Sequence, residues 1–327
     1  MTDIHAAPLE TLTLPQVLLR QAARLKNRPL PALREKAYGV WQAYSWEEYL
    51  GYVRRTALGF HELGLKRGEI VGLVVNNHPE WLFCELGVQS LGGVTVNLFT
   101  SSITEELRTA VSRFRAAYVV AQDQEQVDKL LDARGKLPHV RKVVYIDPTG
   151  MSSYEDHPWL IRFSELQERG RAGEERSDGR FEAEVAKGRR EDTAPMILTS
   201  GTTGVPKLAM ISHRNFVEMG VRWREALAIS EGENWLSMSP PAWIVDQMWG
   251  LGVALAAGMT MNFPETPETV AEDFREIGPS LVITASRFWE EMASRIRVKM
   301  SDAGWIKKRL FDLGERLGKS VVAMQSR

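Results

Sequence analysis

The stretch IVGLVVNNHPEWLFCELGVQSLGGVTVNLF, residues 70–99, predicts a strand, a helix and a second strand. Residues 70–76 are rich in Val and contain no charge, which is typical of a strand buried on both faces. A helix is expected from Pro79 to Ser90, because proline is well suited to the first helical position. Residues 94–99 form the second strand. This order indicates a strand–helix–strand unit with parallel strands.

The same alternation continues outward from this unit. Upstream, Ser45 and Glu48 have the spacing of a capping box that starts a helix. Downstream in the first block, the expected helices are 104–114 and one ending at Leu131, and the expected strands are 117–123 and 140–147. A second block begins at Pro195, with strands 196–200, 208–212, 234–239, 259–263 and 280–285, and helices 213–228, 245–257, 287–300 and one starting at Thr266. The predicted fold class is therefore α/β, with two alternating subdomains whose largely parallel sheets are covered by helices.

The composition changes between the two blocks. Residues 164–193 are dense in charge and glycine and contain few large apolar side chains. Such a segment favours a solvated linker, with a short helix around residues 181–187. We therefore expect a first subdomain at 1–163, a charged linker at 164–193 and a second, incomplete subdomain at 194–327.

Composition narrows the class of protein. Of the 327 residues, 44% are hydrophobic and 25% are charged, as in an ordinary globular protein. A net charge of −1 gives no electrostatic case for a nucleic-acid partner. Cys84 is the sole cysteine and cannot form an intramolecular disulfide, so a cytoplasmic setting is expected. The six histidines are not spaced as metal ligands, either with one another or with Cys84, so no metal site is expected.

No targeting or membrane segment is predicted. The first ten residues lack the basic and apolar regions of a signal peptide. Two uncharged runs, 86–104 and 247–264, contain glycine and polar residues and are better interpreted as a buried helix followed by a strand.

The stretch TSGTTGVPK, residues 199–207, carries the clearest chemical signal. It combines hydroxyl groups, glycines and one ammonium group, from Thr199, Ser200, Thr202, Thr203, Gly201, Gly204 and Lys207. Glycines let backbone amides approach a ligand, and amides, hydroxyls and a lysine are the donors that a polyphosphate requires. The stretch is not a Walker motif, because Pro206 precedes the lysine and Leu208 follows it. From these residues alone, a phosphate loop and a ligand-free turn both remain open.

Longer stretches carry a resemblance to a known family. TSGTTGVPKLAMISHRN (199–215) resembles the phosphate-loop signature of the adenylate-forming, or AMP-binding, enzymes. Residues 64–99 resemble the early segment of that family, and residues 234–247 resemble its acyl-pocket segment. PSLVITASRFWEEM (279–292) is similar to a stretch of long-chain acyl-CoA synthetases. The resemblance covers about residues 12–320.

This resemblance implies a two-step reaction. A fatty acid carboxylate attacks the α-phosphorus of ATP to give an acyl-adenylate and pyrophosphate, and the thiol of coenzyme A then displaces AMP. ATP, Mg²⁺ and coenzyme A are the implied cofactors and co-substrates. By resemblance, residues 199–207 would hold the β- and γ-phosphates and Trp243 would line the acyl pocket. A core tryptophan is the alternative interpretation of Trp243.

The sequence also departs from the family pattern. Leu208 stands where a glycine usually follows the loop lysine, residues 241–243 are Pro-Ala-Trp without the usual histidine, and Ser286 replaces a proline. The later family motifs, which hold adenine, ribose and magnesium and supply a catalytic lysine, are not found. We therefore assign no catalytic residue, expect the C-terminal lid domain to be absent, and expect little ligase activity from this stretch alone.

Two further hypotheses remain open. One is a non-catalytic, nucleotide-binding module that has kept the loop but lost turnover. The other is peripheral membrane contact through an amphipathic helix at residues 14–26, for which core packing is the commoner alternative. The sequence does not indicate an oligomeric state.

Overall fold

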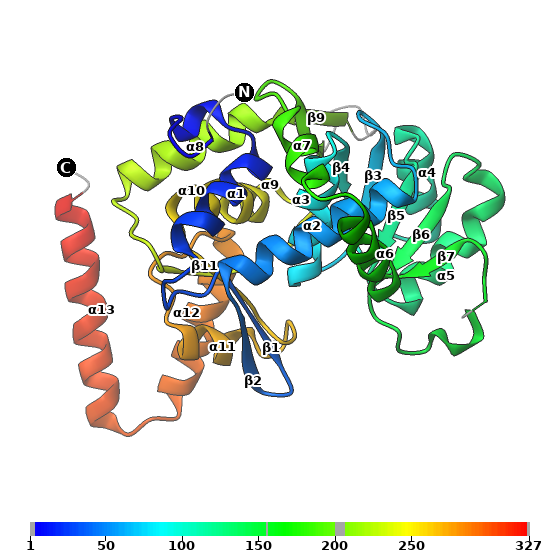
Figure 1. Cartoon of the computed structure of the whole chain (residues 1–327). Coiled ribbons are helices and arrows are strands. Elements are labelled where there is room, and N and C mark those ends of the chain that lie inside the picture. The colour runs from blue at the N-terminus through cyan, green and yellow to red at the C-terminus, as the bar shows by residue number, and fades with distance from the viewer. Residues whose placement is uncertain (1–3, 155, 200–206, 326–327) are drawn as a thin grey trace. The chain divides into compact units, whose positions relative to one another are not determined.

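The fold was determined as a computed structural model, which describes residues 4–154, 156–199 and 207–325 (Figure 1). The chain divides into two compact units, one ending at Val282 and the other beginning at Ile283. The first unit contains both β-sheets and is described first.

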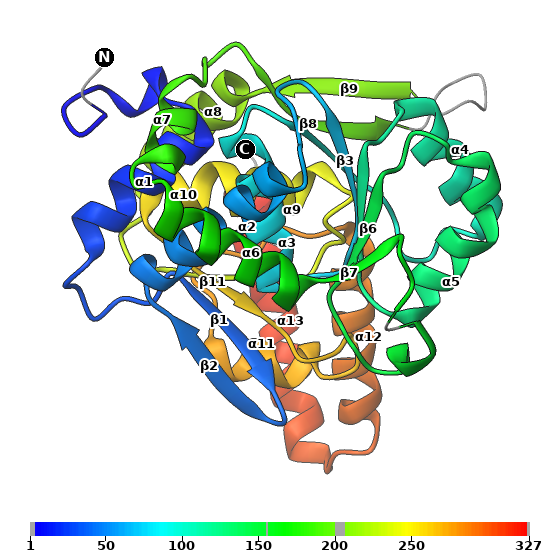
Figure 2. The same ribbon diagram turned by 45° about the vertical axis from the view of Figure 1, so that its right-hand side comes forward.

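The larger sheet of the first unit has seven strands in the order β7-β6-β5-β3-β4-β8-β9 (Figures 1 and 2). The strands are β3 (Ile70–Val74), β4 (Val94–Asn97), β5 (Tyr118–Ala121), β6 (Lys142–Tyr145), β7 (Leu160–Arg162), β8 (Thr193–Thr199) and β9 (Lys207–Ser212). Every neighbouring pair is parallel except β8 and β9, which are antiparallel. The predicted parallel sheet is therefore confirmed, and the short connection from β8 to β9 accounts for the exception.

Helices cover both faces of this sheet, as expected (Figure 2). On one side lie α4 (Thr104–Phe114) and α5 (Gln124–Ala133), whose buried side chains Leu107, Val111 and Leu130 pack on the sheet. On the other side lie α2 (Trp46–Glu62) and α3 (Pro79–Ser90). The bounds of α3 and α4 agree with the predicted ones, and α2 starts with the predicted capping box of Ser45 and Glu48.

The segment expected to be a solvated linker differs from that expectation. Residues 164–193 contain nearly all of α6 (Phe163–Arg176), which was not predicted, and α7 (Arg180–Ala186), which confirms the short helix predicted around residues 181–187. A Cβ on Gly170 of α6 would collide with the carbonyl oxygen of Arg55, and one on Gly59 of α2 would collide with that of Leu166. The glycines therefore let two helices pack closely rather than make the chain flexible. The sheet also joins β8 to β4, so residues from both expected subdomains share one sheet.

A second, four-stranded sheet has the order β10-β11-β1-β2. Its strands are β1 (Leu33–Ala37), β2 (Val40–Tyr44), β10 (Asn234–Leu236) and β11 (Thr260–Phe263). Strands β1 and β2 form a hairpin that the sequence analysis did not predict. Its turn residues Tyr38 and Gly39 have φ values of 51° and 75°, which suits a two-residue hairpin turn. Strand β1 also pairs with β11, which brings residue 33 beside residue 261.

The remaining elements of the first unit include one unusual helical stretch. The expected helix 245–257 forms as α9 (Ile244–Asp246), a π-helical segment (Gln247–Val253) and α10 (Ala254–Ala257). The other elements are α1 (Leu14–Leu25), α8 (His213–Ala226), α11 (Val270–Ile277) and the 3₁₀ turns Leu9–Thr11, Arg134–Lys136 and Met151–Tyr154. Helix α11 begins four residues after the predicted start at Thr266, because residues 267–269 form a turn.

The predicted strand at residues 280–285 is wrong. This run has the composition of a strand, yet no strand pairs with it within residues 4–154, 156–199 and 207–325. A strand requires a neighbour for its backbone hydrogen bonds, so composition alone does not form one.

The second unit consists of α12 (Ser286–Ser301) and α13 (Trp305–Gln325). The former agrees with the predicted helix 287–300. In the part of the chain that the structure describes, no helix has both the length and the apolar character needed to cross a bilayer. The apolar residues of α1, among them Val17, Leu18 and Leu25, are buried within the protein. Core packing, the alternative given for that helix, is therefore confirmed.

One buried carboxylate links several of these elements. Glu85 of α3 has no exposed surface, and burial raises its pKa. It accepts hydrogen bonds from five neutral side chains, namely Trp81 Nε1 (2.7 Å), Thr95 Oγ1 (2.6 Å), Asn97 Nδ2 (2.8 Å), Gln89 Nε2 (3.2 Å) and Gln247 Nε2 (3.2 Å). These donors belong to α3, β4 and the π-helical segment. The carboxylate therefore joins a helix, a strand and a distant part of the chain.

We predict that Glu85→Ala lowers the free energy of unfolding by at least about 3 kcal/mol, because several buried donors lose their acceptor at once. Urea unfolding followed by circular dichroism measures this loss. Glu168→Ala on the exposed side of α6 is the control and should change stability by less than about 0.5 kcal/mol. Equal stability of the Glu85→Ala variant and the parent would contradict the role of this carboxylate.

Candidate functional site

The carboxyl ends of the parallel strands share one edge of the seven-stranded sheet, since β8 runs parallel to β4 and β4 to β3. Ligands of open α/β sheets bind at this edge. Polar residues follow the strands there, namely Asn76 and Asn77 after β3, Thr100 after β4, Gln122 after β5 and Asp147 after β6, and Thr199 ends β8. The chain continues from β3 to β4 on one side of the sheet and from β5 to β6 on the other, so the topological switch point lies between β3 and β5. At this point the backbone N–H of Asn76 donates to Gln122 Oε1 at 3.2 Å.

The two ends of the predicted phosphate loop lie at this edge. Thr199 and Lys207 face each other as the last register pair of β8 and β9. The Thr199 hydroxyl donates to the Lys207 carbonyl oxygen at 3.2 Å, and both residues are exposed. The other predicted residues of the loop, Ser200, Gly201, Thr202, Thr203 and Gly204, lie outside the described residues. Among the ion pairs of the described chain, none involves the Lys207 ammonium group.

Leu208, the departure from the family pattern, has a packing role. It is the register partner of Leu198 across the β8–β9 pair. Both side chains are partly buried and pack against the apolar core that α4 and α5 form on the sheet. A branched apolar residue at this position therefore extends the apolar core to the residue that follows the predicted phosphate loop.

Trp243, the predicted acyl-pocket residue, lies at the start of α9. Its side chain is 46% exposed, so Trp243 is not a core tryptophan. Its backbone N–H donates to the carbonyl oxygen of Pro240 at 2.8 Å. The neighbouring Ile244 is also exposed. This turn therefore presents apolar surface to solvent.

The segment that carries Trp243 is anchored by a buried acid. Asp246 has no exposed surface. Its oxygens accept hydrogen bonds from Trp235 Nε1 (3.0 Å), Asn77 Nδ2 (2.8 Å) and Ser237 Oγ (3.1 Å). Burial raises the pKa of Asp246 to about 7, although these hydrogen bonds act in the opposite direction. Asp246 therefore ties α9 to β10 and to the loop after β3.

The adjacent Gln247 makes a second anchor. Its side-chain amide donates to Glu85 at 3.2 Å and to the carbonyl oxygen of Pro241 at 3.0 Å. The π-helical segment that follows packs on α8, where Gly220 approaches Gly252 so closely that a Cβ on Gly220 would collide with the Gly252 backbone. π-helical segments occur frequently at functional sites.

Sequence reasoning missed these anchoring residues. Asp246 lies 169 residues after its partner Asn77, and Gln247 lies 162 residues after its partner Glu85, so no local spacing connects them. A usable signal does exist, because Glu85 interrupts the otherwise apolar run at residues 81–88 and Asp246 directly precedes an uncharged run. A charge at such a position requires a buried partner.

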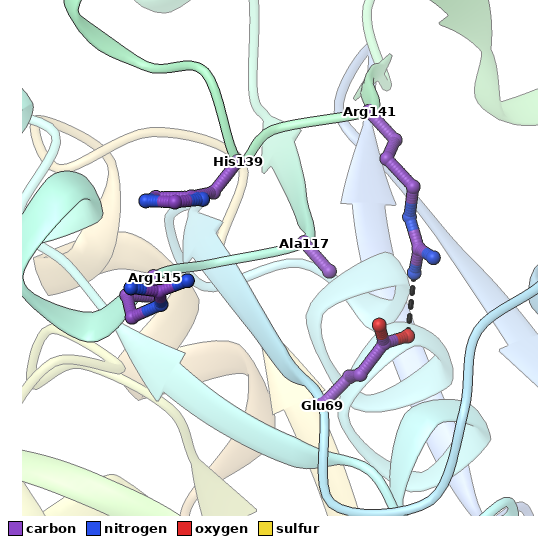
Figure 3. A pocket seen from close by; sticks show the side chains of 5 residues that line it. All are labelled: Glu69, Arg115, Ala117, His139 and Arg141. Carbon is purple, nitrogen blue, oxygen red and sulfur yellow. Dashed lines mark hydrogen bonds and ion pairs between the residues drawn. The ribbon is translucent and has the colours of Figure 1, made fainter.

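The structure also shows a hollow of about 300 Å³ on the opposite edge of the same sheet (Figure 3). It is lined by Glu69, Arg115, Ala117, His139 and Arg141, and Arg141 forms an ion pair with Glu69. Glu69, Ala117 and Arg141 directly precede β3, β5 and β6, so the hollow lies at the amino ends of the strands. It is therefore not the place where the loop 199–207 begins and ends.

One group of side chains in the described residues has the composition of a metal site. It contains Glu35, His78 and Glu80, whose ligand atoms lie within 4.8 Å of one another. The search for regular histidine spacing missed it, because Glu35 is 43 residues from His78 in the chain.

Comparison with known proteins agrees with this architecture. The chain is 26% identical over 328 residues to the long-chain-fatty-acid–CoA ligase ACSBG2 of Xenopus laevis, with 97% of this chain and 43% of that protein covered. It is 27% identical over 290 residues to the long-chain-fatty-acid–CoA ligase ACSBG1 of Rattus norvegicus, with 86% and 39% covered. The chain thus spans about two fifths of the length of these relatives.

Solved structures show the same fold. A putative long-chain-fatty-acid CoA ligase from Rhodopseudomonas palustris CGA009 gives a TM-score of 0.65 at 20% identity, with 82% of this chain and 62% of that chain covered. The A-PCP didomain of the carboxylic acid reductase from Segniliparus rugosus, in complex with AMP, gives a TM-score of 0.74 at 17% identity, with 94% and 47% covered.

The family model described as "AMP-binding enzyme" matches residues 18–325, which is nearly the whole chain. The chain therefore belongs to the AMP-binding enzyme family.

Proposed function

We propose that this chain supplies the ATP-binding and acyl-binding part of an enzyme that activates a long-chain fatty acid, first as acyl-AMP and then as acyl-CoA. The observation that carries the proposal is the stretch TSGTTGVPK, whose end residues Thr199 and Lys207 lie at the carboxyl edge of the sheet in a chain that the family model matches. The names of the curated relatives support a long-chain substrate. No catalytic residue is assigned within this chain.

In this proposal the loop positions the triphosphate. Amides and hydroxyls of residues 199–204 would surround the β- and γ-phosphates, and Lys207 would neutralise part of their charge. The contribution of the loop would be orientation of the α-phosphorus toward the carboxylate and stabilisation of the departing pyrophosphate. Lys207 is the last residue of the loop and is exposed, which supports this role.

Mg²⁺ and coenzyme A belong to the proposal as cofactor and co-substrate. Mg²⁺ in such sites is held by carboxylates together with substrate phosphates. Among the described residues, the group suited to a metal is Glu35, His78 and Glu80, which does not include the residues at the ends of the loop. No residue of this chain is assigned to Mg²⁺ at the loop, and we derive no step through the ion.

For the fatty acid we propose that Trp243 lines the acyl pocket. Its partial exposure supports this role, because a residue that contacts a ligand needs accessible apolar surface. Asp246 and Gln247, which follow Trp243 closely in the chain, make buried hydrogen bonds to Asn77 and Glu85. These hydrogen bonds hold the turn that carries Trp243 in place. The buried apolar face of α1 gives no support to membrane contact through that helix.

The proposed role of the loop predicts a loss of nucleotide affinity in Lys207→Ala. One charge-assisted contact is lost, which corresponds to about 1.5–3 kcal/mol. Isothermal titration with ATP and Mg²⁺ measures the change. Lys66→Ala is the matched control, since Lys66 is exposed and precedes the amino end of β3. Equal ATP affinity in Lys207→Ala and the parent would refute the role of the loop, whereas ATP binding without turnover in a chain extended to full family length would favour the non-catalytic module.

The proposed role of Trp243 predicts weaker binding of long-chain fatty acids in Trp243→Ala, by several-fold, because apolar contact area is removed. Displacement of a fluorescent fatty acid measures the affinity. Tyr38→Ala removes an aromatic side chain that is 96% exposed at the hairpin turn, and serves as the control. The assignment fails if both variants bind fatty acid as the parent does.

The pKa of Asp246 predicts a pH dependence of stability. In the folded chain this pKa is about 7, well above the ordinary value of 3.8, so the folded state keeps a proton that the unfolded chain releases. The resulting stabilisation is complete below about pH 4 and is lost as the pH rises to about 7, with a slope of up to about 1.4 kcal/mol per pH unit. Urea unfolding between pH 5 and 8 should show a flatter pH profile for Asp246→Asn than for the parent. Asp132→Asn, at an exposed position, should keep the parent's profile, and an unchanged profile in Asp246→Asn would show that Asp246 does not titrate in this range.

A further inference from the structure

Three potential metal ligands meet where β1 of the four-stranded sheet contacts α3. Glu35 lies on β1 of the four-stranded sheet, His78 is the N-cap residue of α3, and Glu80 lies in the first turn of α3. The distance from His78 Nδ1 to Glu35 Oε1 is 2.9 Å. One ligand atom from each of the three residues lies within 4.8 Å of the other two.

The donor set is specific in its chemistry. One imidazole nitrogen and two carboxylate oxygens are ligands that Zn²⁺ and related divalent transition metals prefer. Mg²⁺ selects oxygen ligands and retains much of its water, so an imidazole distinguishes this group from a magnesium site. Metal–ligand bonds of about 2.0–2.2 Å place neighbouring ligand atoms roughly 3–3.5 Å apart. Small rotations of the three side chains would bring them to such separations.

The negative charges of Glu35 and Glu80 are not neutralised by a lysine or arginine among the described residues. Within the described residues, neither Glu35 nor Glu80 forms an ion pair with a lysine or arginine, and His78 is the sole cationic partner of Glu35. All three residues are partly buried. Burial and the negative charge of Glu35 raise the pKa of Glu80. Burial acts to lower the pKa of His78, but the hydrogen bond to Glu35 and the charge of Glu35 outweigh it, so this pKa is raised as well. Glu35 thus pairs with the one imidazole, and the carboxylate of Glu80 lies nearby without an ion pair among the described residues.

A second neighbour orients the group. The Tyr44 hydroxyl of β2 donates to the other oxygen of Glu35 at 3.4 Å. An outer hydrogen bond of this kind fixes the direction of a ligating carboxylate. Because Glu35 and His78 are 43 residues apart in the chain, an ion at this point would connect β1 of the four-stranded sheet to the start of α3.

We propose that Glu35, His78 and Glu80 form a binding site for a divalent transition metal ion, with Zn²⁺ as the matching ion. The bound ion clamps β1 to the start of α3, beside Asn77, which anchors Asp246. The role of the ion is structural: it neutralises the two carboxylates and fixes the loop after β3. The proposal does not depend on the proposed function, because it concerns residues outside the loop 199–207 and Trp243.

The test uses the full chain after removal of metal with a chelator and exchange into chelator-free buffer. Titration with Zn²⁺ should show one bound ion per chain, and Zn²⁺ should raise the midpoint of thermal unfolding. Titration with Co²⁺ should give visible absorption bands from an ion held by protein ligands. Absence of stoichiometric Zn²⁺ binding by the parent chain would overturn the proposal.

Glu80→Gln separates metal binding from damage to the fold. The substitution keeps the shape of the side chain and removes one of the two negative charges. Without metal, its thermal midpoint should equal or exceed that of the parent, while its Zn²⁺ affinity should fall at least tenfold and the Zn²⁺-induced shift should disappear. Glu106→Gln, at an exposed position in the first turn of α4, is the control and should bind Zn²⁺ as the parent does. Parent-like Zn²⁺ affinity in Glu80→Gln would show that the ion binds elsewhere.

Discussion

The fold depends on the hydrogen bonds that the buried carboxylate of Glu85 accepts. This group has no exposed surface, and its hydrogen-bond donors are neutral side chains of α3, β4 and the π-helical segment. A buried acceptor of this kind is stable only while its donors remain in place. Apolar packing alone would tolerate a small slide of α3 along β4, but directional hydrogen bonds do not. The carboxylate therefore fixes the register of helix and strand and holds residue 247 against them.

The same polar network reaches the carboxyl edge of the sheet. Gln247 contacts Glu85, and its neighbour Asp246 contacts Asn77, the second of the polar residues after β3. The half-exposed Trp243 lies three residues before Asp246. The candidate acyl-binding turn and the loop after β3 are thus held to one another through buried hydrogen bonds. Such a connection keeps an exposed apolar side chain in a fixed place without burying it.

Much of this architecture could be predicted from the sequence, and the failures have physical causes. The bounds of α3 and α4 were predictable because proline and the end of an apolar period are local signals. Helix α6 was missed because glycine and charge were interpreted as flexibility. In the structure, Gly170 lets α6 approach α2, and charged residues of α6 pair with α2 at its surface, as Arg176 does with Glu62. The run 280–285 shows the converse error, since strand composition has no effect without a neighbouring strand.

The candidate site likewise has one part that local sequence signals predict and one part that they do not. The predicted phosphate loop is recognisable because its residues are contiguous, whereas the residues that anchor the turn of Trp243 lie at positions 77, 85 and 246. No spacing rule connects such positions, and the same holds for Glu35 and His78. What the sequence does contain is the anomaly of a charged residue inside an apolar pattern. Burial of a charge without partners costs several kcal/mol, so each anomaly implies a partner elsewhere in the chain. The sequence can thus show that Glu85 and Asp246 need partners, and only the fold identifies Asn97 and Asn77 as those partners.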